Sequence, residues 1–320
     1  FWAEYQNNPQ EPGSADSVML DAEEVAAKTN GRKRGKVPLQ CDTLTCHIDV
    51  HKKLLYYTVV AWESGFTGYV LDYGTYPKQR QRYFRLDGVD RTIKRVHQGM
   101  GTDGAVYKAL EELTGDILSK EWPRDDGAVM RVNLCLIDQG WKTDTVHQFC
   151  RQTQWAQTVM PARGQGITAS NKPISEYSRR KGDKIGHHWW IPRMKRKRVL
   201  RHLEIDTNYW KTFIHERLGT AMGDSGCLSL WGRKPSRHRL FAEQLTAEYR
   251  VVTEGRGRKV DAWKLPAHQP DNHWFDCMVG CAAAASVRGV ERIGAPSGKS
   301  KGRKKDGKKK KRKRVKPLKC

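Results

Sequence analysis

Three aspartates in this sequence stand where carboxylates can bind divalent metal ions. Asp49 lies inside an apolar strand pattern, Asp138 ends the apolar run "VMRVNLCLID", and Asp276 falls in the first turns of the last predicted helix. Two strand carboxylates and one helix carboxylate can hold a pair of Mg²⁺ or Mn²⁺ ions roughly 4 Å apart, an arrangement that hydrolyses phosphodiesters. The cysteines form no CxxC pair, so no soft-ligand set competes for a metal.

Strand alternation explains how Asp49 fits into an apolar segment. Side chains alternate between the two faces of a strand, so one face of residues 43–50 is apolar and Asp49 points to the other. Asp138 directly precedes a turn at Gly140, and open α/β sheets commonly place functional groups just past strand ends. The two strands that carry these aspartates are expected to be neighbours at the centre of the sheet.

The helix that carries Asp276 is predicted to pack closely against this sheet. Its face bears small side chains, at Gly280, Ala283 and Ala284, followed by Val287. Each aspartate also has a structural interpretation. Asp49 can pair with Lys52 or Lys53, Asp138 can cap the "DQG" turn, and Asp276 can interact with the helix dipole. Their order along the chain favours the metal site.

The elements that must position these aspartates follow from apolar periodicity. Strands are predicted at 43–50, 53–62 and 67–73, forming an antiparallel meander. A helix at 104–122 leads to a strand at 129–138 whose continuous apolar run is typical of burial on both faces, followed by a helix at 142–153 and a strand at 156–162. The predicted order is β-β-β-α-β-α-β.

The second half of the chain begins with a basic segment at 163–201, interpreted as a hairpin or loop insertion. Helices are predicted at 207–218 and 237–249, a short strand at 260–266, and the last helix at 271–289, with Asp271 or Asn272 as its N-cap. The segment from residue 299 to the end holds fourteen Lys or Arg against the single acid Asp306, and we expect it to be disordered.

Charge and composition indicate the kind of partner. The net charge is +24, and the body stays basic without the tail, which suits a polyanion. The eight cysteines are interpreted as reduced, buried thiols. Apolar runs are too short to span a bilayer, so no membrane association is expected. The stretch "GAPSGKS" fails as a nucleotide-binding P-loop because its spacing is one residue short and no strand precedes it.

A series of ordered motifs resembles one protein family. They are "FWAEYQNNP", "HIDVHKKLLYYTVVAW", "YVLDYGTYP", "LIDQGWKTDTVHQFC", "IDTNYWKTFIHERL", "FAEQLTAEYRVV" and "NHWFDCMVGCAAAA", spread across roughly residues 1–290. Together they resemble the C-terminal nuclease domain of tailed-phage terminase large subunits of the lambda-like GpA type. The resemblance implies an RNase H-like α/β fold, a mixed five-stranded sheet flanked by helices, and a metal-dependent DNA endonuclease that cuts concatemeric phage DNA.

The resemblance also assigns roles to residues. Asp49, Asp138 and Asp276 match the family's catalytic, metal-binding acids. Two positions depart from the family: His51 stands where a Gln is frequent, and His273 where many relatives carry Glu. Both are candidates for a place beside the metals, or for packing alone. The segment "IDTNYWK" adds Asp206 and Lys211 as possible supporting residues. Asp206 is also a candidate N-cap, and Lys211 is expected on the exposed face of its helix.

Domain organisation follows from the same comparison. Residues 1–40 are expected to be an arm or linker after an ATPase domain upstream of residue 1, residues 41–290 the nuclease domain, and residues 291–320 a disordered basic tail. The expected partners are double-stranded phage DNA, the terminase small subunit and the portal or procapsid, in the host cell cytoplasm. Candidate DNA-binding residues are Lys52, Lys53, Arg193, Lys195, Arg196, Lys197 and Arg198.

Two other functions stay open at the level of sequence. A DDE-type transposase or recombinase uses the same fold and three carboxylates, and would give strand-transfer products. A non-catalytic basic DNA-binding packaging protein would bind DNA in a salt-sensitive manner but need no divalent metal.

Overall fold

The fold is known from a computed structural model that describes residues 19–193 and 200–291. Its strands are β1 (Thr43–Val50), β2 (Leu55–Trp62), β3 (Gly68–Tyr76), β4 (Trp122–Pro123), β5 (Val129–Met130), β6 (Leu134–Asp138), β7 (Val159–Gln165), β8 (Lys184–Gly186), β9 (Trp189–Ile191), β10 (Leu203–Asp206), β11 (Leu228–Leu230), β12 (Tyr249–Gly255) and β13 (Arg258–Lys264). Its α-helices are α2 (Ala22–Ala27), α3 (Ile93–Val96), α4 (Thr102–Leu118), α5 (Thr143–Gln152), α6 (Thr207–Gly219), α7 (Arg239–Leu245) and α8 (His273–Val287).

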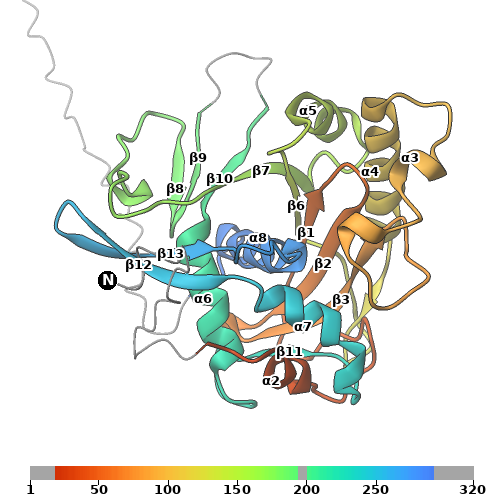
Figure 1. Cartoon of the computed structure of the whole chain (residues 1–320), viewed down its shortest axis with the longest axis horizontal. Coiled ribbons are helices and arrows are strands. Elements are labelled where there is room, and N and C mark those ends of the chain that lie inside the picture. Colours follow the sequence, from red (N-terminus) through yellow and green to blue (C-terminus); the bar gives the residue numbers. More distant parts are fainter. Residues whose placement is uncertain (1–18, 194–199, 292–320) are drawn as a thin grey trace, which may run out of the picture.

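In the described part of the chain, nine strands form the main sheet, in the order β11-β3-β2-β1-β6-β7-β10-β9-β8 (Figure 1). The five predicted strands lie together at its centre as β3-β2-β1-β6-β7, with β1, β2 and β3 antiparallel and β6 and β7 parallel to β1. This is the predicted RNase H-like arrangement. The predicted number of five strands is wrong for the whole sheet, because β8 to β11 have only three or four residues each and show no readable periodicity.

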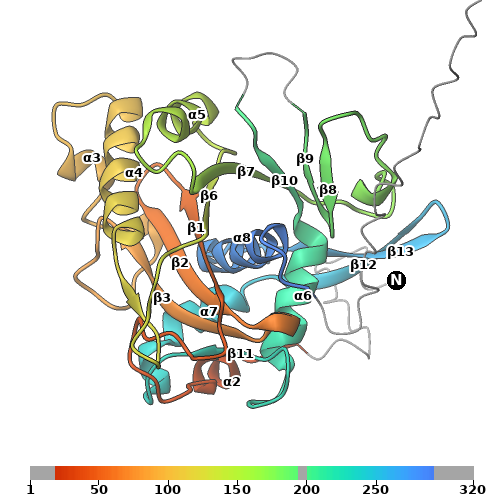
Figure 2. The ribbon, with the colours of Figure 1, turned by 180° about the vertical axis from the view of Figure 1, so that it is seen from behind.

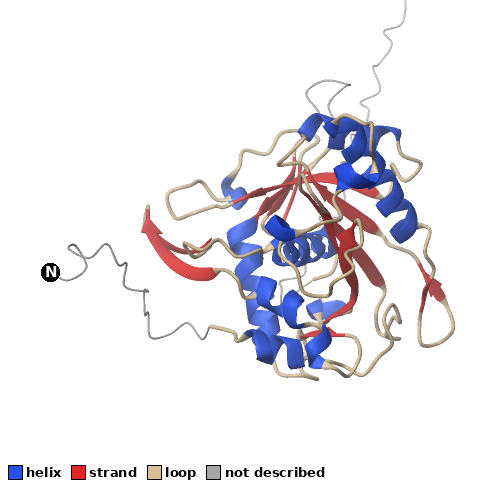
Figure 3. Ribbon diagram, turned by 45° about the vertical axis from the view of Figure 1, so that its right-hand side comes forward, coloured by secondary structure: helices blue, strands red, loops and turns tan. Residues whose placement is uncertain are grey.

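Helices cover both faces of the sheet (Figure 3). One face of β1, with Leu44, Cys46 and Ile48, packs against α4 and α5, which lie next to each other in Figures 1 and 2. The other face packs against α8, and α6 and α7 pack on α8 in turn. The face of β1 that carries Asp49 is therefore covered by a helix rather than open to solvent.

The predicted close packing of α8 on the sheet is confirmed at Gly280. A Cβ atom built at this position would lie 1.9 Å from Cδ2 of His47 on β1, so any larger residue would push the helix away from the sheet. Ala283 and Ala284 on the same face are fully buried. Glycine and alanine thus set the distance between α8 and β1, and with it the position of the residues at the start of α8.

Residues 19–40 pack onto the domain instead of forming a separate arm. Val25 of α2 and Val37 are fully buried, and backbone bridges join Thr29 to Leu230 and Val37 to Arg124. The folded body therefore begins before the boundary predicted at residue 41, because this segment supplies apolar side chains to the core. The predicted arm residues 1–18 and the predicted basic tail from residue 292 lie outside the described residues.

Several other strands and helices differ in length from their predicted ranges. The strand expected at 129–138 is divided between the short β5 and β6, and the helix expected at 237–249 ends at Leu245. The next residues form β12, which pairs with β13 in a hairpin that projects from the body in Figures 1 and 2. The predicted basic insertion contributes β8 and β9 to the edge of the main sheet. The seven described cysteines are free and buried, as predicted.

Candidate metal centre

The three predicted aspartates line one cleft with a volume of about 610 Å³. It opens at the C-terminal ends of β1 and β6 and at the start of α8. Ile48 pairs with Ile137 in the parallel β1–β6 register, so Asp49 and Asp138 follow each other across neighbouring strands about 4.8 Å apart. The prediction that these two strands are neighbours is therefore confirmed, and α8 brings Asp276 to the same cleft.

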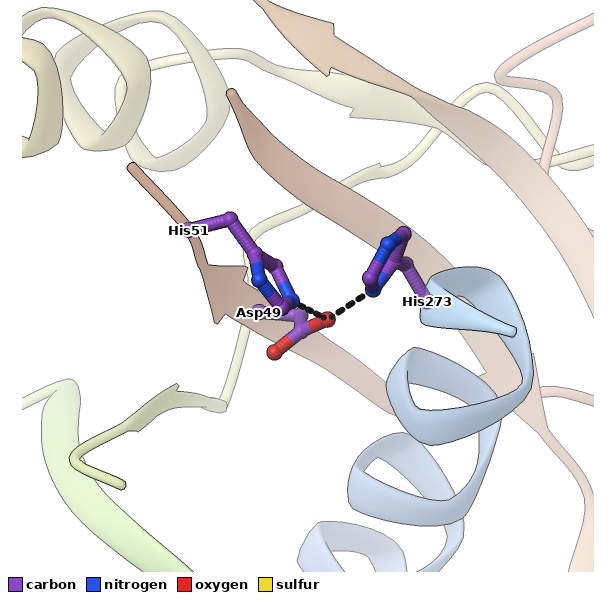
Figure 4. Close-up of side chains that lie close together, drawn as sticks. All are labelled: Asp49, His51 and His273. Atoms are coloured by element: carbon purple, nitrogen blue, oxygen red, sulfur yellow. Dashed lines mark hydrogen bonds and ion pairs between the residues drawn. The ribbon is translucent and has the colours of Figure 1, made fainter. Parts of the chain in front are cut away.

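Asp49 is held between two histidines (Figure 4). Nε2 of His51 donates a hydrogen bond to Oδ2 of Asp49 at 2.8 Å, and Nδ1 of His273 donates to the same oxygen at 3.1 Å. The Asp49 side chain is 9% exposed and that of His273 11%, whereas that of His51 is 34% exposed. Asp49 comes from β1, His51 directly follows β1, and His273 begins α8. Three chain positions therefore converge on one carboxylate oxygen.

The electrostatics of this group favour an ionised Asp49. Burial alone would raise the pKa of Asp49, but the charge of His51 and hydrogen bonds from both imidazoles hold that pKa well below its usual range. Burial opposes the charged form of His51, yet the neighbouring Asp49 raises the pKa of this imidazole above its usual value. Carboxylate and imidazole thus stabilise each other's charged forms inside the cleft.

Among the described residues, no imidazole is hydrogen-bonded to Asp138. Its Oδ2 accepts a hydrogen bond from the backbone N–H of Gly140 at 3.0 Å, so it also caps the turn after β6. Burial, together with the negative charges of Asp49 and Asp276, raises the pKa of Asp138 to about 7. A carboxyl group in this situation gains stability when a cation enters the cleft.

Asp276 is paired with a buried lysine. Nζ of Lys211 on α6 lies 3.0 Å from Oδ1 of Asp276 and also pairs with Glu248. Asn272 donates to Oε1 of Glu248 at 2.6 Å. The expectation that Lys211 lies on an exposed helix face is wrong: this side chain is only 11% exposed, because α8 and β13 cover this side of α6. Sequence reasoning missed Glu248, since it lies between α7 and a strand that was not predicted.

Within the described residues, the side chains of Asp49, His51 and His273 form a group that could hold a metal ion, because their ligand atoms all lie within 4.8 Å of one another. Asp138 and Asp276 line the same cleft outside this group. The structure therefore brings the three aspartates to one cleft, and it adds two histidines directly on Asp49. Imidazole nitrogens and carboxylate oxygens can both bind divalent transition metals.

Asp206 lies away from the metal group. It is the N-cap of α6, as predicted, because its side chain accepts the backbone N–H of Tyr209 at 3.3 Å, and it also pairs with His188. Glu204 on the same strand lines the cleft and pairs with His202 at 2.9 Å. No sequence pattern pointed to Glu204, because the four-residue strand β10 is too short to show periodicity and was not predicted.

The predicted DNA-binding residues Lys52 and Lys53 directly follow the cleft residue His51 in sequence and line a separate, smaller pocket. Lys52 is exposed, and Nζ of Lys53 donates to the carbonyl oxygen of Asp87 at 2.5 Å. Arg193 is exposed, whereas the predicted residues Lys195, Arg196, Lys197 and Arg198 lie outside the described part of the chain.

A further basic segment, residues 78–95, was not among the predicted DNA-binding residues. Residues 78–95 hold seven Lys or Arg and two Asp, and most of these side chains are exposed. The backbone N–H of Ile93 donates to the Lys53 carbonyl at 2.8 Å, and that of Leu86 donates to Asp271 at 2.7 Å. The segment is therefore fixed between the residues that follow β1 and those that precede α8.

Comparison with known proteins identifies the family. No curated protein matches the chain. Among solved structures, the nuclease domain of the large terminase subunit of bacterial virus Sf6 is similar at 11% identity and a TM-score of 0.41, covering 83% of this chain and 98% of that one. A mutant of that domain with manganese shows 12% identity, the same coverage and a TM-score of 0.40. In the part of the chain described by the structure, no helix is long and apolar enough to cross a membrane. The family model of the terminase large subunit gpA endonuclease domain matches residues 9–295, so this chain belongs to that family of viral DNA-packaging endonucleases.

Proposed function

We propose that this domain cuts double-stranded phage DNA by metal-dependent hydrolysis, with Asp49, Asp138 and Asp276 as ligands of two Mg²⁺ or Mn²⁺ ions. The observation that carries the proposal is the convergence of these three carboxylates on one cleft at the ends of β1 and β6. When bound, such ions supply an activated water and stabilise the leaving oxygen of the phosphodiester.

The residues of the cleft suit cations. Asp138 has a pKa of about 7 because burial and two neighbouring carboxylates oppose its charge, so a cation is the missing counter-charge. Asp276 is oriented by Lys211, which pairs with Oδ1. The Asp276 side chain is 36% exposed, which leaves it accessible from the cleft. Lys211 would serve as a positioning residue, and Glu248 and Asn272 would hold it in place.

DNA would approach over the basic rim of the cleft. Lys52, Lys53 and the segment 78–95 would supply positive charge next to His51 and the start of α8, with Arg193 as a further cation. Lys or Arg contacts to phosphates give most of the affinity for a duplex. Because residues 86–93 contact both Lys53 and Asp271, a phosphate bound there would be close to the cleft. The predicted segment 195–198 would add to this surface.

The family also suggests the assembly in which the domain works. We infer that an ATPase domain upstream of residue 1, the terminase small subunit and the portal or procapsid are its partners, and that it acts in the host cytoplasm. The basic residues from 299 onward would bind DNA or the portal.

Cleavage of supercoiled plasmid tests the proposal. With Mn²⁺ or Mg²⁺ the protein should give nicked and linear DNA, and EDTA should abolish both products. Asp49→Asn and Asp138→Asn should be inactive while still binding the plasmid. Cleavage that survives both substitutions would contradict the proposal. Strand-transfer products would instead indicate a recombinase, and metal-independent binding without cleavage a DNA-binding protein.

A further inference from the structure

We propose that Asp49, His51 and His273 form a two-histidine, one-carboxylate metal site that selects Mn²⁺ and similar transition-metal ions over Mg²⁺ and Ca²⁺. The inference deepens the proposed function: it assigns two further ligands to one of the ions and predicts which ions the protein takes. It rests on the geometry around Asp49 (Figure 4), where two imidazoles stand on one carboxylate oxygen.

The spacing of the three donor atoms fits one metal ion. In an octahedral site with bonds of about 2.1 Å, neighbouring ligand atoms are about 3.0 Å apart. Oδ2 of Asp49 lies 2.8 Å from Nε2 of His51 and 3.1 Å from Nδ1 of His273. All three ligand atoms lie within 4.8 Å of one another. Two bonds of about 2.1 Å span at most about 4.2 Å, so a shift of the imidazoles by less than about 1 Å would let all three atoms bind one ion. The protons that now join these atoms would be replaced by the metal.

Packing fixes the directions of the imidazoles. The ring of His273 lies on Tyr56 with a centroid distance of 4.5 Å and an interplanar angle of 33°. The ring of His51 meets Tyr56 edge-on at 6.3 Å and approaches His273 at 4.0 Å. Tyr56 is fully buried, and it stands opposite Asp49 in the antiparallel register of β1 and β2. One tyrosine therefore holds both histidines over the carboxylate, and an ordered ligand set needs little rearrangement to bind.

The charges around Asp49, His51 and His273 favour the binding of a metal cation over a state in which Asp49 is paired only with two protonated histidines. In the described part of the chain, the ion pairs of Asp49 are those with His51 and His273, with no lysine or arginine among them. Asp138 and Asp276 add negative charge to the same cleft. His47, on β1, differs from these two histidines: its Nδ1 atom is buried with no hydrogen-bond partner among the described residues, and its ring packs against Gly280.

The ligand types determine the selectivity. Mg²⁺ and Ca²⁺ prefer all-oxygen sites, and Mg²⁺ gives up its water reluctantly, whereas imidazole nitrogen is a good ligand for first-row transition metals. Replacing two oxygen ligands by two nitrogens therefore penalises Mg²⁺ and Ca²⁺ more than Mn²⁺.

The test measures metal binding directly, with the whole chain and the ions alone. Mn²⁺ binding is followed by the loss of the free-ion EPR signal, and Mg²⁺ and Ca²⁺ by competition. Pulsed EPR of the bound Mn²⁺ should show the ¹⁴N couplings of directly coordinated imidazole. His51→Gln and His273→Gln should each weaken Mn²⁺ binding by at least about tenfold and Mg²⁺ binding by less than about threefold. His147→Gln, which changes another histidine lining the cleft, is the matched control and should change neither.

Two results would overturn the inference: bound Mn²⁺ without ¹⁴N coupling in the unmodified protein, or equal losses of Mn²⁺ and Mg²⁺ affinity in the histidine variants. The first needs no substitution, so it stands even where a variant fails to fold. Plasmid cleavage separates this outcome from the proposed function. A protein that cleaves DNA but shows no ¹⁴N coupling keeps its function and loses the histidine ligands. A protein that shows the coupling but never cleaves keeps the site and loses the function.

Discussion

Asp49 and Asp276 line the same cleft but are neutralised in different ways. Asp49 is paired with two imidazoles, whose nitrogens can release a proton and bind a metal. Asp276 is paired with the ammonium group of Lys211. Burial alone would lower the pKa of Lys211, but the neighbouring carboxylates of Asp276 and Glu248 raise it above its usual value, so Lys211 stays charged. Asp138 is intermediate: within residues 19–193 and 200–291 it accepts a backbone N–H and forms no ion pair.

The difference indicates separate tasks for the parts of the cleft. The partners of Asp49 are exchangeable, so this part can gain and lose an ion. A separate network joins Glu248 to Lys211 and Asn272, which both donate to it. The charges of Lys211 and Glu248 balance each other without a metal ion. We therefore expect metal chemistry to depend most on Asp49, and the folded shape of the cleft to depend most on Lys211.

The largest effect is expected on removing the charge of Asp49. Asp49→Asn keeps the shape of the side chain but loses a metal-ligand carboxylate, so cleavage should fall by at least about 10³-fold, or ~4 kcal/mol of transition-state stabilisation. Plasmid cleavage rates at saturating Mn²⁺ measure this. Asp224→Asn, at an exposed carboxylate outside the cleft lining, is the control and should be as active as the unmodified protein. Activity within tenfold for Asp49→Asn would remove Asp49 from the centre of the mechanism.

The second-largest effect is expected on removing the charge of Lys211. Lys211→Met leaves Glu248, whose side chain is 3% exposed, as a buried charge without its cation. Breaking a buried ion pair from one side costs about 3–5 kcal/mol, so denaturant unfolding should show a loss of this size. Adding Glu248→Gln to Lys211→Met should recover part of it, since the uncompensated charge is then gone. A loss below ~1 kcal/mol for the single variant would contradict the buried pair.

The raised pKa of Asp138 predicts that the stability of the metal-free protein depends on pH. Its pKa is raised to about 7 in the folded state, against an ordinary value near ~3.9 for the unfolded chain. Its contribution to stability is thus complete below about pH 4 and is lost as pH rises through about 7. Thermal unfolding in EDTA should show a lower Tm at pH 8.5 than at pH 5.5, with a smaller decrease for Asp138→Asn. Mn²⁺ should reduce the difference between the two proteins, and identical pH slopes in EDTA would refute the assignment.

The smallest effect is expected at the basic rim, outside the cleft. Arg80→Ala with Arg82→Ala removes two exposed charges from the segment 78–95, so the Kd for duplex DNA should rise by about threefold to tenfold. The slope of log Kd against log salt should fall by about one for each phosphate that the variant no longer binds. Lys259→Ala with Lys264→Ala on the β13 hairpin removes the same charge elsewhere and is the control. Equal changes in both pairs would mean that net charge alone binds DNA.

The central order of the fold and the three aspartates could be predicted from local sequence patterns. Strong periodicity marks β1, β2, β3 and β6, because each is an alternating or continuous apolar run. The small residues of α8 predicted its close packing, which Gly280 confirms. These features depend on neighbours within one strand or helix, which is the range over which sequence patterns carry information.

The surroundings of each aspartate, in contrast, depend on tertiary packing. His273 reaches Asp49 across 224 positions of sequence, and Lys211 reaches Glu248 across 37. Lys211 was expected on an exposed helix face, yet α8 and β13 pack against α6 and bury it. The side chains that neutralise a carboxylate are set by which helices and strands pack together, and that packing is a balance of long-range contacts that no local pattern records.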